Sequence, residues 1–111
     1  MQTLIHVFCQ AGPSLRDKIA KDERRLKKFE LYVESQKTQA RARGWTKVKS
    51  LGAKNGAINL DWDRDAMVLV CRVVTRGSGD PAPIVGDLVS YLLSHHFARF
   101  RMLTIVPEAG K

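Results

Sequence analysis

Basic residues recur at helical spacing near the start of this chain. Lys18, Lys21, Arg25 and Lys28 stand three or four positions apart, so a helix that spans them carries all four on one flank. Lysine and arginine side chains in such a row can contact successive phosphates of a nucleic acid. The pattern therefore predicts a surface that binds nucleic acid or another polyanion. Four later basic residues could extend this surface: Arg41, Arg43, Lys47 and Lys49.

The distribution of charge favours an acidic partner. The 111 residues include 19 lysines and arginines against 11 acids, which gives a formal net charge of +8. Residues 1–55 hold 13 of the basic residues and 5 of the acids, whereas residues 56–111 hold six of each. The whole excess lies in the N-terminal half, as in proteins that bind polyanions. Two other interpretations stay open: a solvated helix face, and an adaptor surface for an acidic protein.

A second candidate site surrounds Arg72, a charged residue inside the apolar run 67–76. A tight turn at residues 64–65 would pair Ala57 with Arg72 and place Arg72 and Asp61 on the same sheet face, away from the core. A charge on a covered face needs a partner. The pattern predicts either an ion pair at a dimer interface or a site for an anion or substrate. The residues of this alternative ligand site are Arg72, Asp61, Asn59 and His6.

The acidic run at residues 61–65 resembles the opening of a calcium loop in its spacing alone. A calcium loop also requires a glycine at its sixth position and a glutamate at its twelfth. Ala66 and Arg72 occupy those positions. We therefore predict a hairpin turn at this point and no bound metal.

Other reactive residues lack the neighbours that catalysis requires. The loop 76–81 joins a strand to a helix but lacks the full glycine pattern of a phosphate loop. His95 and His96 are expected to cap the end of a helix, where imidazole is favourable. Cys9 and Cys71 are expected to be buried thiols. We therefore expect no catalytic residue and no cofactor, and lean toward a protein that is not an enzyme.

Hydrophobic periodicity predicts the elements that position these residues. Alternating or continuously apolar runs indicate strands, and apolar residues at 3-and-4 spacing indicate helices. The resulting order, β-α-β-β-β-α-β, predicts an α+β domain at residues 1–107, with a flexible tail at 108–111. A ferredoxin-like sandwich with one extra strand and both helices on one sheet face fits this order. In chain order the expected elements are a strand at 3–9, a helix at 14–43, strands at 45–50, 57–63 and 67–76, a helix at 81–96 and a strand at 100–106.

The expected first helix is long for so small a protein. No glycine or proline interrupts residues 15–43, and Ser14 is a good N-cap. A helix of this length extends about 44 Å, whereas a globule of this size has a radius of gyration of about 13 Å. The end of the helix is therefore expected to project from the domain or to pack on another subunit.

Two helices can cover only one face of the sheet, yet several strands are apolar on both faces. An uncovered apolar face is unfavourable in water, so we predict a homodimer. The competing interpretations are a monomer with a ligand pocket on that face, and a dimeric α/β-barrel-like protein with a small-molecule or enzymatic site. No apolar run is long enough to span a membrane, and the first residues lack the basic start of a signal peptide. A cytoplasmic location is therefore expected.

Overall fold

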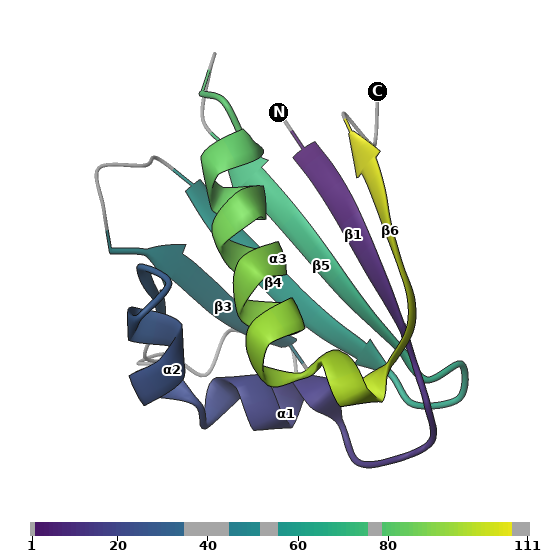
Figure 1. The fold of residues 1–111 in the computed structure, drawn as a ribbon. Coiled ribbons are helices and arrows are strands. Elements are labelled where there is room, and N and C mark those ends of the chain that lie inside the picture. The colour runs from purple at the N-terminus through teal and green to yellow at the C-terminus, as the bar shows by residue number, and fades with distance from the viewer. Residues whose placement is uncertain (1, 35–44, 52–55, 76–78, 108–111) are drawn as a thin grey trace.

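The computed structural model describes residues 2–34, 45–51, 56–75 and 79–107 of the chain. Within these residues, six strands form one sheet that packs against three α-helices and a short 3-10 helix (Figure 1). This arrangement confirms the predicted α+β class, and the radius of gyration is 13.1 Å. In chain order the elements are β1 (Gln2–Cys9), α1 (Leu15–Ala20), α2 (Glu23–Lys27), β2 (Leu31–Val33), β3 (Trp45–Ser50), β4 (Gly56–Asp63), β5 (Val68–Thr75), α3 (Ala82–His95), η1 (Phe97–Arg99) and β6 (Phe100–Pro107).

All neighbouring strands are antiparallel, in the order β2-β3-β4-β5-β1-β6. The two most apolar strands, β1 and β5, lie inside the sheet, as their sequences predict. Ile5 and Val7 of β1 are fully buried, whereas Leu4 and His6 on its other face are half-buried. Figure 1 shows α1, α2 and α3 on the same side of the sheet. We call the opposite side the open sheet face.

The hydrophobic core lies between the sheet and the helices. Side chains alternate between the two faces of each strand, and most of those on the helix side of the inner strands β4, β5 and β1 are fully buried under the helices. Burial of each such Leu or Ile side chain stabilises the fold by about 1.5–3 kcal/mol. The helices contribute Leu15, Ile19, Leu26, Ile84, Leu88 and Leu92 to this core.

The prediction of one long helix at residues 14–43 is wrong. α1 ends at Ala20, Lys21 is its C-cap, and α2 begins after Asp22. Asp22 has φ −106° and ψ 37°, which breaks the helical path. The helix therefore does not project from the domain within residues 14–34. The remainder of the predicted helix, residues 35–44, lies outside the described residues.

A strand that the sequence pattern concealed, β2, follows α2. Glu30 has a φ of 60°, a left-handed conformation that reverses the chain after the helix. Leu31 and Val33 then pair with Ser50 and Val48 of β3. Apolar residues at helical spacing also fit a short strand, so pairing with β3 decides the outcome here. The sheet consequently has six strands in the described residues instead of the five predicted.

The hairpin between β4 and β5 has a longer turn than predicted. Residues 64–67 form the turn, and the Oδ1 atom of Asp63 accepts hydrogen bonds from the backbone N–H groups of Asp65 and Ala66, both at 3.1 Å. Arg72 therefore pairs with Asn59 and not with Ala57. The register differs from the prediction by two residues, which keeps every strand residue on its expected face.

α3 covers the sheet and lies close to the start of β4. A Cβ atom at Gly56 would approach Ile84 Cδ1 to 2.6 Å and the backbone oxygen of Val74 to 2.9 Å, so the close approach of β5 and α3 favours glycine here. The Oδ1 atom of Asp80 accepts a hydrogen bond from the Ala82 N–H at 3.0 Å, close to the predicted start of the helix. His96 is the C-cap, as predicted. Among the described residues, the helices are too short or too polar to cross a bilayer.

Candidate functional site

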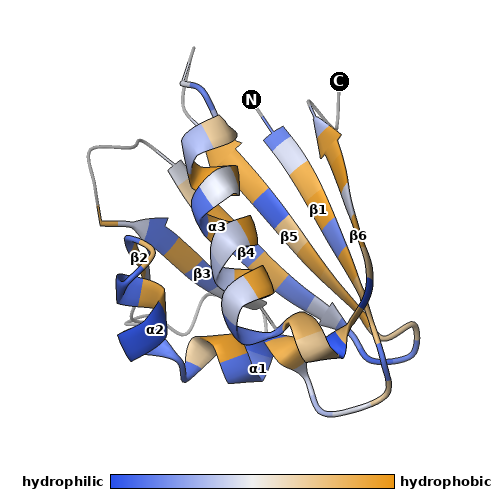
Figure 2. Cartoon of the chain, viewed as in Figure 1, coloured by the Kyte–Doolittle hydropathy of each residue, from blue (hydrophilic) through white to orange (hydrophobic). Residues whose placement is uncertain are grey.

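The main candidate site is the segment from residue 16 to residue 28, which we call the basic lobe. It contains α1, α2 and the turn between them, and Figure 2 shows how hydrophilic α2 is. The lobe holds seven basic and three acidic residues, so its formal charge is +4, half of the total for the chain. Six of the basic side chains are exposed, and the seventh, Arg16, is half-buried. The basic residues are Arg16, Lys18, Lys21, Arg24, Arg25, Lys27 and Lys28.

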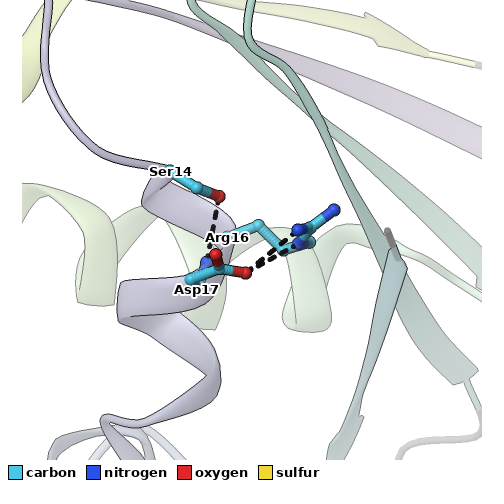
Figure 3. Close-up of polar contacts among 3 residues, drawn as sticks. All are labelled: Ser14, Arg16 and Asp17. Atoms are coloured by element: carbon cyan, nitrogen blue, oxygen red, sulfur yellow. Dashed lines mark hydrogen bonds and ion pairs between the residues drawn. The ribbon is translucent and has the colours of Figure 1, made fainter. Parts of the chain in front are cut away.

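Most of these cations are not neutralised by neighbouring acids. Arg16 contacts Asp17 at 3.0 Å (Figure 3), and Arg25 contacts Asp22 at 3.8 Å. In the part of the chain that the structure describes, the other five basic side chains of the lobe form no ion pair. They are therefore available to contact an anionic partner.

The start of α1 is fixed by the predicted N-cap. Ser14 Oγ accepts a hydrogen bond from the Asp17 N–H at 3.2 Å (Figure 3). This bond satisfies one of the free N–H groups in the first turn of the helix. Leu15 and Ile19 are fully buried, so the opposite side of α1 faces solvent. The cap and the buried pair together fix the direction in which Lys18 points.

A buried polar cluster attaches the basic lobe to α3. The phenol oxygen of Tyr91 lies 2.7 Å from Asp22 Oδ2 and 2.8 Å from His96 Nε2. His96 Nε2 is also 3.5 Å from Asp22 Oδ2. An ionised carboxylate only accepts hydrogen bonds, and a phenol has one proton. Tyr91 therefore donates to Asp22, and the Nε2–H group of His96 donates to Tyr91. We call these three residues the Tyr91 cluster.

The surroundings of the Tyr91 cluster keep both of its ring residues neutral. Burial raises the pKa of Tyr91, and the hydrogen bond to Asp22 raises it further. Burial lowers the pKa of His96, although the nearby Asp22 carboxylate opposes this shift. Only 9% of the His96 side chain and 19% of the Asp22 side chain are exposed.

Aromatic contacts extend the attachment between the lobe and α3. The ring of Phe29, directly after α2, lies 6.0 Å from the Tyr91 ring and 5.7 Å from the His95 ring, both edge-to-face. Edge-to-face rings at these distances attract each other beyond the burial of their surface. Because Tyr91 is fully buried, its phenol cannot reach a substrate. The Tyr91 cluster therefore holds the basic lobe in place and takes no part in a reaction with a substrate.

Sequence reasoning missed the Tyr91 cluster. In the sequence, Asp22 is an acid at an apolar position of the helix predicted at residues 14–43, and His96 is expected only to cap the end of the second helix. The partners are 69 residues apart in the chain, so no local pattern connects Asp22 with Tyr91. A usable signal was the combination of an acid on a buried stripe with a tyrosine on the apolar face of the second helix.

Of the four residues predicted to extend the basic surface, the structure describes only two, and these two lie away from the basic lobe. Lys47 and Lys49 flank the buried Val48 on β3, so they point toward the open sheet face, away from the lobe. Both contact Glu34, with Nζ–O distances of 3.7 Å from Lys47 and 3.2 Å from Lys49. The structure therefore separates these two lysines from Lys18, Lys21, Arg25 and Lys28. Arg41 and Arg43 lie outside the described residues.

The alternative ligand residues share the open sheet face, as predicted. Asn59 pairs with Arg72, and Asp61 and His6 both pair with Val70 on the strand between them. Arg72 and Asp61 are exposed, and within the described residues no ion pair joins them. The Oδ1 atom of Asn59 is buried and has no hydrogen-bond partner among the residues that the structure describes.

A shallow hollow of about 350 Å³ lies at one end of the open sheet face, and none of the alternative ligand residues lines it. Its walls are Phe8, Cys9, Ala66, Arg101 and Met102. Burial raises the pKa of the Cys9 thiol, against the opposite effect of the Arg99 guanidinium, so the thiol is a poor nucleophile.

The two cysteines and the acidic residues give no sign of a metal centre. Cys9 and Cys71 are buried and form no disulfide bond, as predicted. The residues that the structure describes hold no group of three or more His, Cys, Asp or Glu side chains placed to bind a metal ion.

Fold and site define a small α+β protein with a six-stranded antiparallel sheet, a helical layer on one face and a basic lobe in that layer. No protein-family model, curated protein or solved structure matches the chain. The functional argument therefore depends on the geometry and charge of the described residues.

Proposed function

We propose that this protein is a non-catalytic, homo-oligomeric binding protein that holds nucleic acid, or a polyanion of similar charge density, on the basic lobe. One observation carries the proposal: five exposed cations within 13 residues form no ion pair in the described part of the chain. Such cations can replace the counterions that are condensed around the phosphates of a nucleic acid. The release of those counterions then drives binding.

The way in which the lobe is held supports binding without large rearrangement. The N-cap at Ser14 and the Tyr91 cluster fix both ends of the segment that carries Lys18 and Lys21. Cations on a fixed backbone lose less conformational freedom when a partner binds than cations on a disordered tail. The lobe is therefore a preorganised surface for a chain of phosphates.

The finer fold that we propose is a ferredoxin-like sandwich with two added strands. Support comes from the antiparallel order β4-β5-β1-β6, with a helical segment between β1 and β4 and α3 between β5 and β6. β2 and β3 extend this unit beyond β4. We also propose a cytoplasmic location, since buried unbonded thiols such as Cys9 and Cys71 suit a reducing compartment.

The small-molecule alternative has one observation in its favour. The unpartnered Oδ1 atom of Asn59 lies on the same face as Arg72, Asp61 and His6, so a ligand with a hydrogen-bond donor could satisfy it. This site would bind a small polar ligand and would be independent of the basic lobe. A third candidate is an acidic protein bound on the lobe, which differs from the main proposal only in the partner.

Two matched double variants test the main proposal. Lys21→Gln with Lys28→Gln removes two charges from the lobe, and Lys47→Gln with Lys49→Gln removes two charges from the open sheet face. Binding of a fluorescent single-stranded oligonucleotide is followed by anisotropy over a range of salt concentrations. The lobe variant should bind more weakly and lower the slope of log affinity against log salt by about 1.4, at about 0.7 per charge for a single strand.

The control variant should bind as the wild type does. Equal weakening by both variants would mean that net charge alone governs binding, and an unchanged lobe variant would refute the site. If the wild type ignores the oligonucleotide but binds an acidic polypeptide such as polyglutamate at low salt, the protein-partner interpretation replaces nucleic acid.

A further inference from the structure

An apolar strip, interrupted by His6 and its neighbour Thr104, crosses the open sheet face over β5, β1 and β6. Strand pairing places Leu4 beside Val106, and Phe8 beside both Val68 and Met102. Met102 and Val106 are 53% and 42% exposed, which is high for large apolar side chains within a sheet. The described helices lie on the other face of the sheet, so none of them covers this strip (Figure 1).

The open sheet face carries much less net charge than the basic lobe. Strand alternation, the Glu34 ion pairs and the position of Arg101 at the hollow place four basic and three acidic side chains on this face in the described residues. A face of mixed charges with a formal charge of +1 repels an identical face only weakly, whereas two lobes of +4 would repel each other strongly. The seven residues are Lys47, Lys49, Arg72, Arg101, Glu34, Asp61 and Asp63.

The arrangement of polar groups beside the strip is self-complementary. In a two-fold symmetric contact, any residue pair that meets once meets twice. Arg72 and Asp61 lie near each other on adjacent strands without an ion pair, so each could reach the opposite charge on a second copy.

We propose that a second copy of this chain packs its open sheet face against the open sheet face of the first, with the apolar strip at the centre and Arg72 and Asp61 forming reciprocal ion pairs at its margin. This inference specifies the interface of the homo-oligomer proposed above and makes no use of polyanion binding. The four strands β4-β5-β1-β6 cover about 26 Å by about 19 Å, or roughly 1,000 Å² for both copies, which reaches the size of a specific interface. The helical layer stays outside, so both basic lobes remain accessible.

Two adjacent residues on β6 provide a matched test. Val106 is 42% exposed on the open sheet face, and Ile105 is 47% exposed on the helix side of the same strand. Light scattering coupled to size exclusion should give a dimer for the wild type and for Ile105→Glu, and a monomer for Val106→Glu. Circular dichroism confirms that each variant is folded.

Each other result of this test overturns the proposal. A monomeric wild type removes the interface, and a dimer that survives Val106→Glu places the contact elsewhere. Dissociation of both variants indicates pairing along the exposed edge of β6 instead of face-to-face packing. Because the measurement contains no nucleic acid, its failure leaves the basic-lobe proposal standing, and failure of oligonucleotide binding leaves the dimer standing.

A charge swap tests the reciprocal ion pairs. Arg72→Asp or Asp61→Arg alone should increase the dimer dissociation constant, because each creates like charges across the two-fold axis. The double variant should restore it to within a few-fold of the wild type. A double variant that dissociates as readily as the worse single variant would contradict the proposed pairing.

Discussion

The two sides of the sheet, one with the basic lobe and one without helices in the described residues, differ in charge. The basic lobe has a formal charge of +4 and exposes lysines and arginines that form no ion pair in the described residues. In the described residues, the open sheet face carries four basic and three acidic side chains around an apolar strip. The first surface suits a polyanion and repels its own copy, whereas the second suits its own copy. Net charge alone would hide this division, because it averages the two faces.

The largest expected effect comes from the cluster that anchors the lobe. Tyr91→Ala should lower the free energy of unfolding by about 3–5 kcal/mol, because it leaves a cavity at a fully buried aromatic ring. Tyr91→Phe keeps the ring but removes both hydrogen bonds, and should cost about 1–3 kcal/mol. Urea unfolding measures both values.

Tyr91→Phe also tests whether the basic lobe and the open sheet face act independently. Loosening of the lobe should weaken oligonucleotide binding, whereas the oligomeric state should not change, because the open sheet face does not include Tyr91. A loss of the dimer in Tyr91→Phe, with the protein still folded, would show that the two sides depend on each other.

A smaller effect is expected at the start of the lobe. Ser14→Ala removes the hydrogen bond that caps α1 and should destabilise the protein by about 1 kcal/mol. Thermal unfolding measures the loss, and Ser14→Asp, which can replace the cap, serves as the matched control. If Ser14→Ala and Ser14→Asp melt at the same temperature, the hydrogen bond from the cap does not contribute to the stability of the protein.

The smallest expected effect is a dependence on pH at His96. Burial holds the pKa of His96 below its unfolded value of 6.5. The unfolded chain therefore binds a proton more readily, so the contribution of His96 is complete above pH 6.5 and is lost as the pH falls toward the folded pKa. The Asp22 carboxylate opposes this lowering of the His96 pKa and keeps the effect on stability small. His95 and Arg25 lower the pKa in the same direction as burial.

Urea unfolding at several pH values between 5 and 8 checks this expectation. His96→Gln should flatten the fall in stability below pH 6.5, whereas His6→Gln, on the open sheet face, should retain the wild-type profile. An identical profile for His96→Gln and the wild type would remove the proposed role of His96 as a neutral donor to Tyr91.

The faces of the strands could be predicted because alternation is a local property. Asn59, Asp61 and Arg72 were placed on the side away from the core, and a register error of two residues left that result intact. The α+β class and the inner positions of β1 and β5 followed from the same pattern. The N-cap at Ser14 depends on four adjacent residues and was predicted for the same reason.

Features that depend on distant residues could not be predicted in this way. Leu31 and Val33 fit the apolar stripe of a helix, and only their pairing with β3 makes them a strand. The break at Asp22 became understandable only when its carboxylate was found beside Tyr91. Lys18, Lys21, Arg25 and Lys28 are exposed on the basic lobe, whereas Lys47 and Lys49, which the sequence pattern groups with them, lie on the open sheet face beside Glu34.

The most direct test of the division between the two faces is light scattering of the wild-type protein with and without a short single-stranded oligonucleotide, at low and at high salt. The account predicts the mass of a dimer without oligonucleotide in both conditions, and a dimer with bound oligonucleotide at low salt only. A protein that is monomeric throughout, or a dimer that dissociates when the oligonucleotide binds, would contradict the assignment of self-association and polyanion binding to opposite faces.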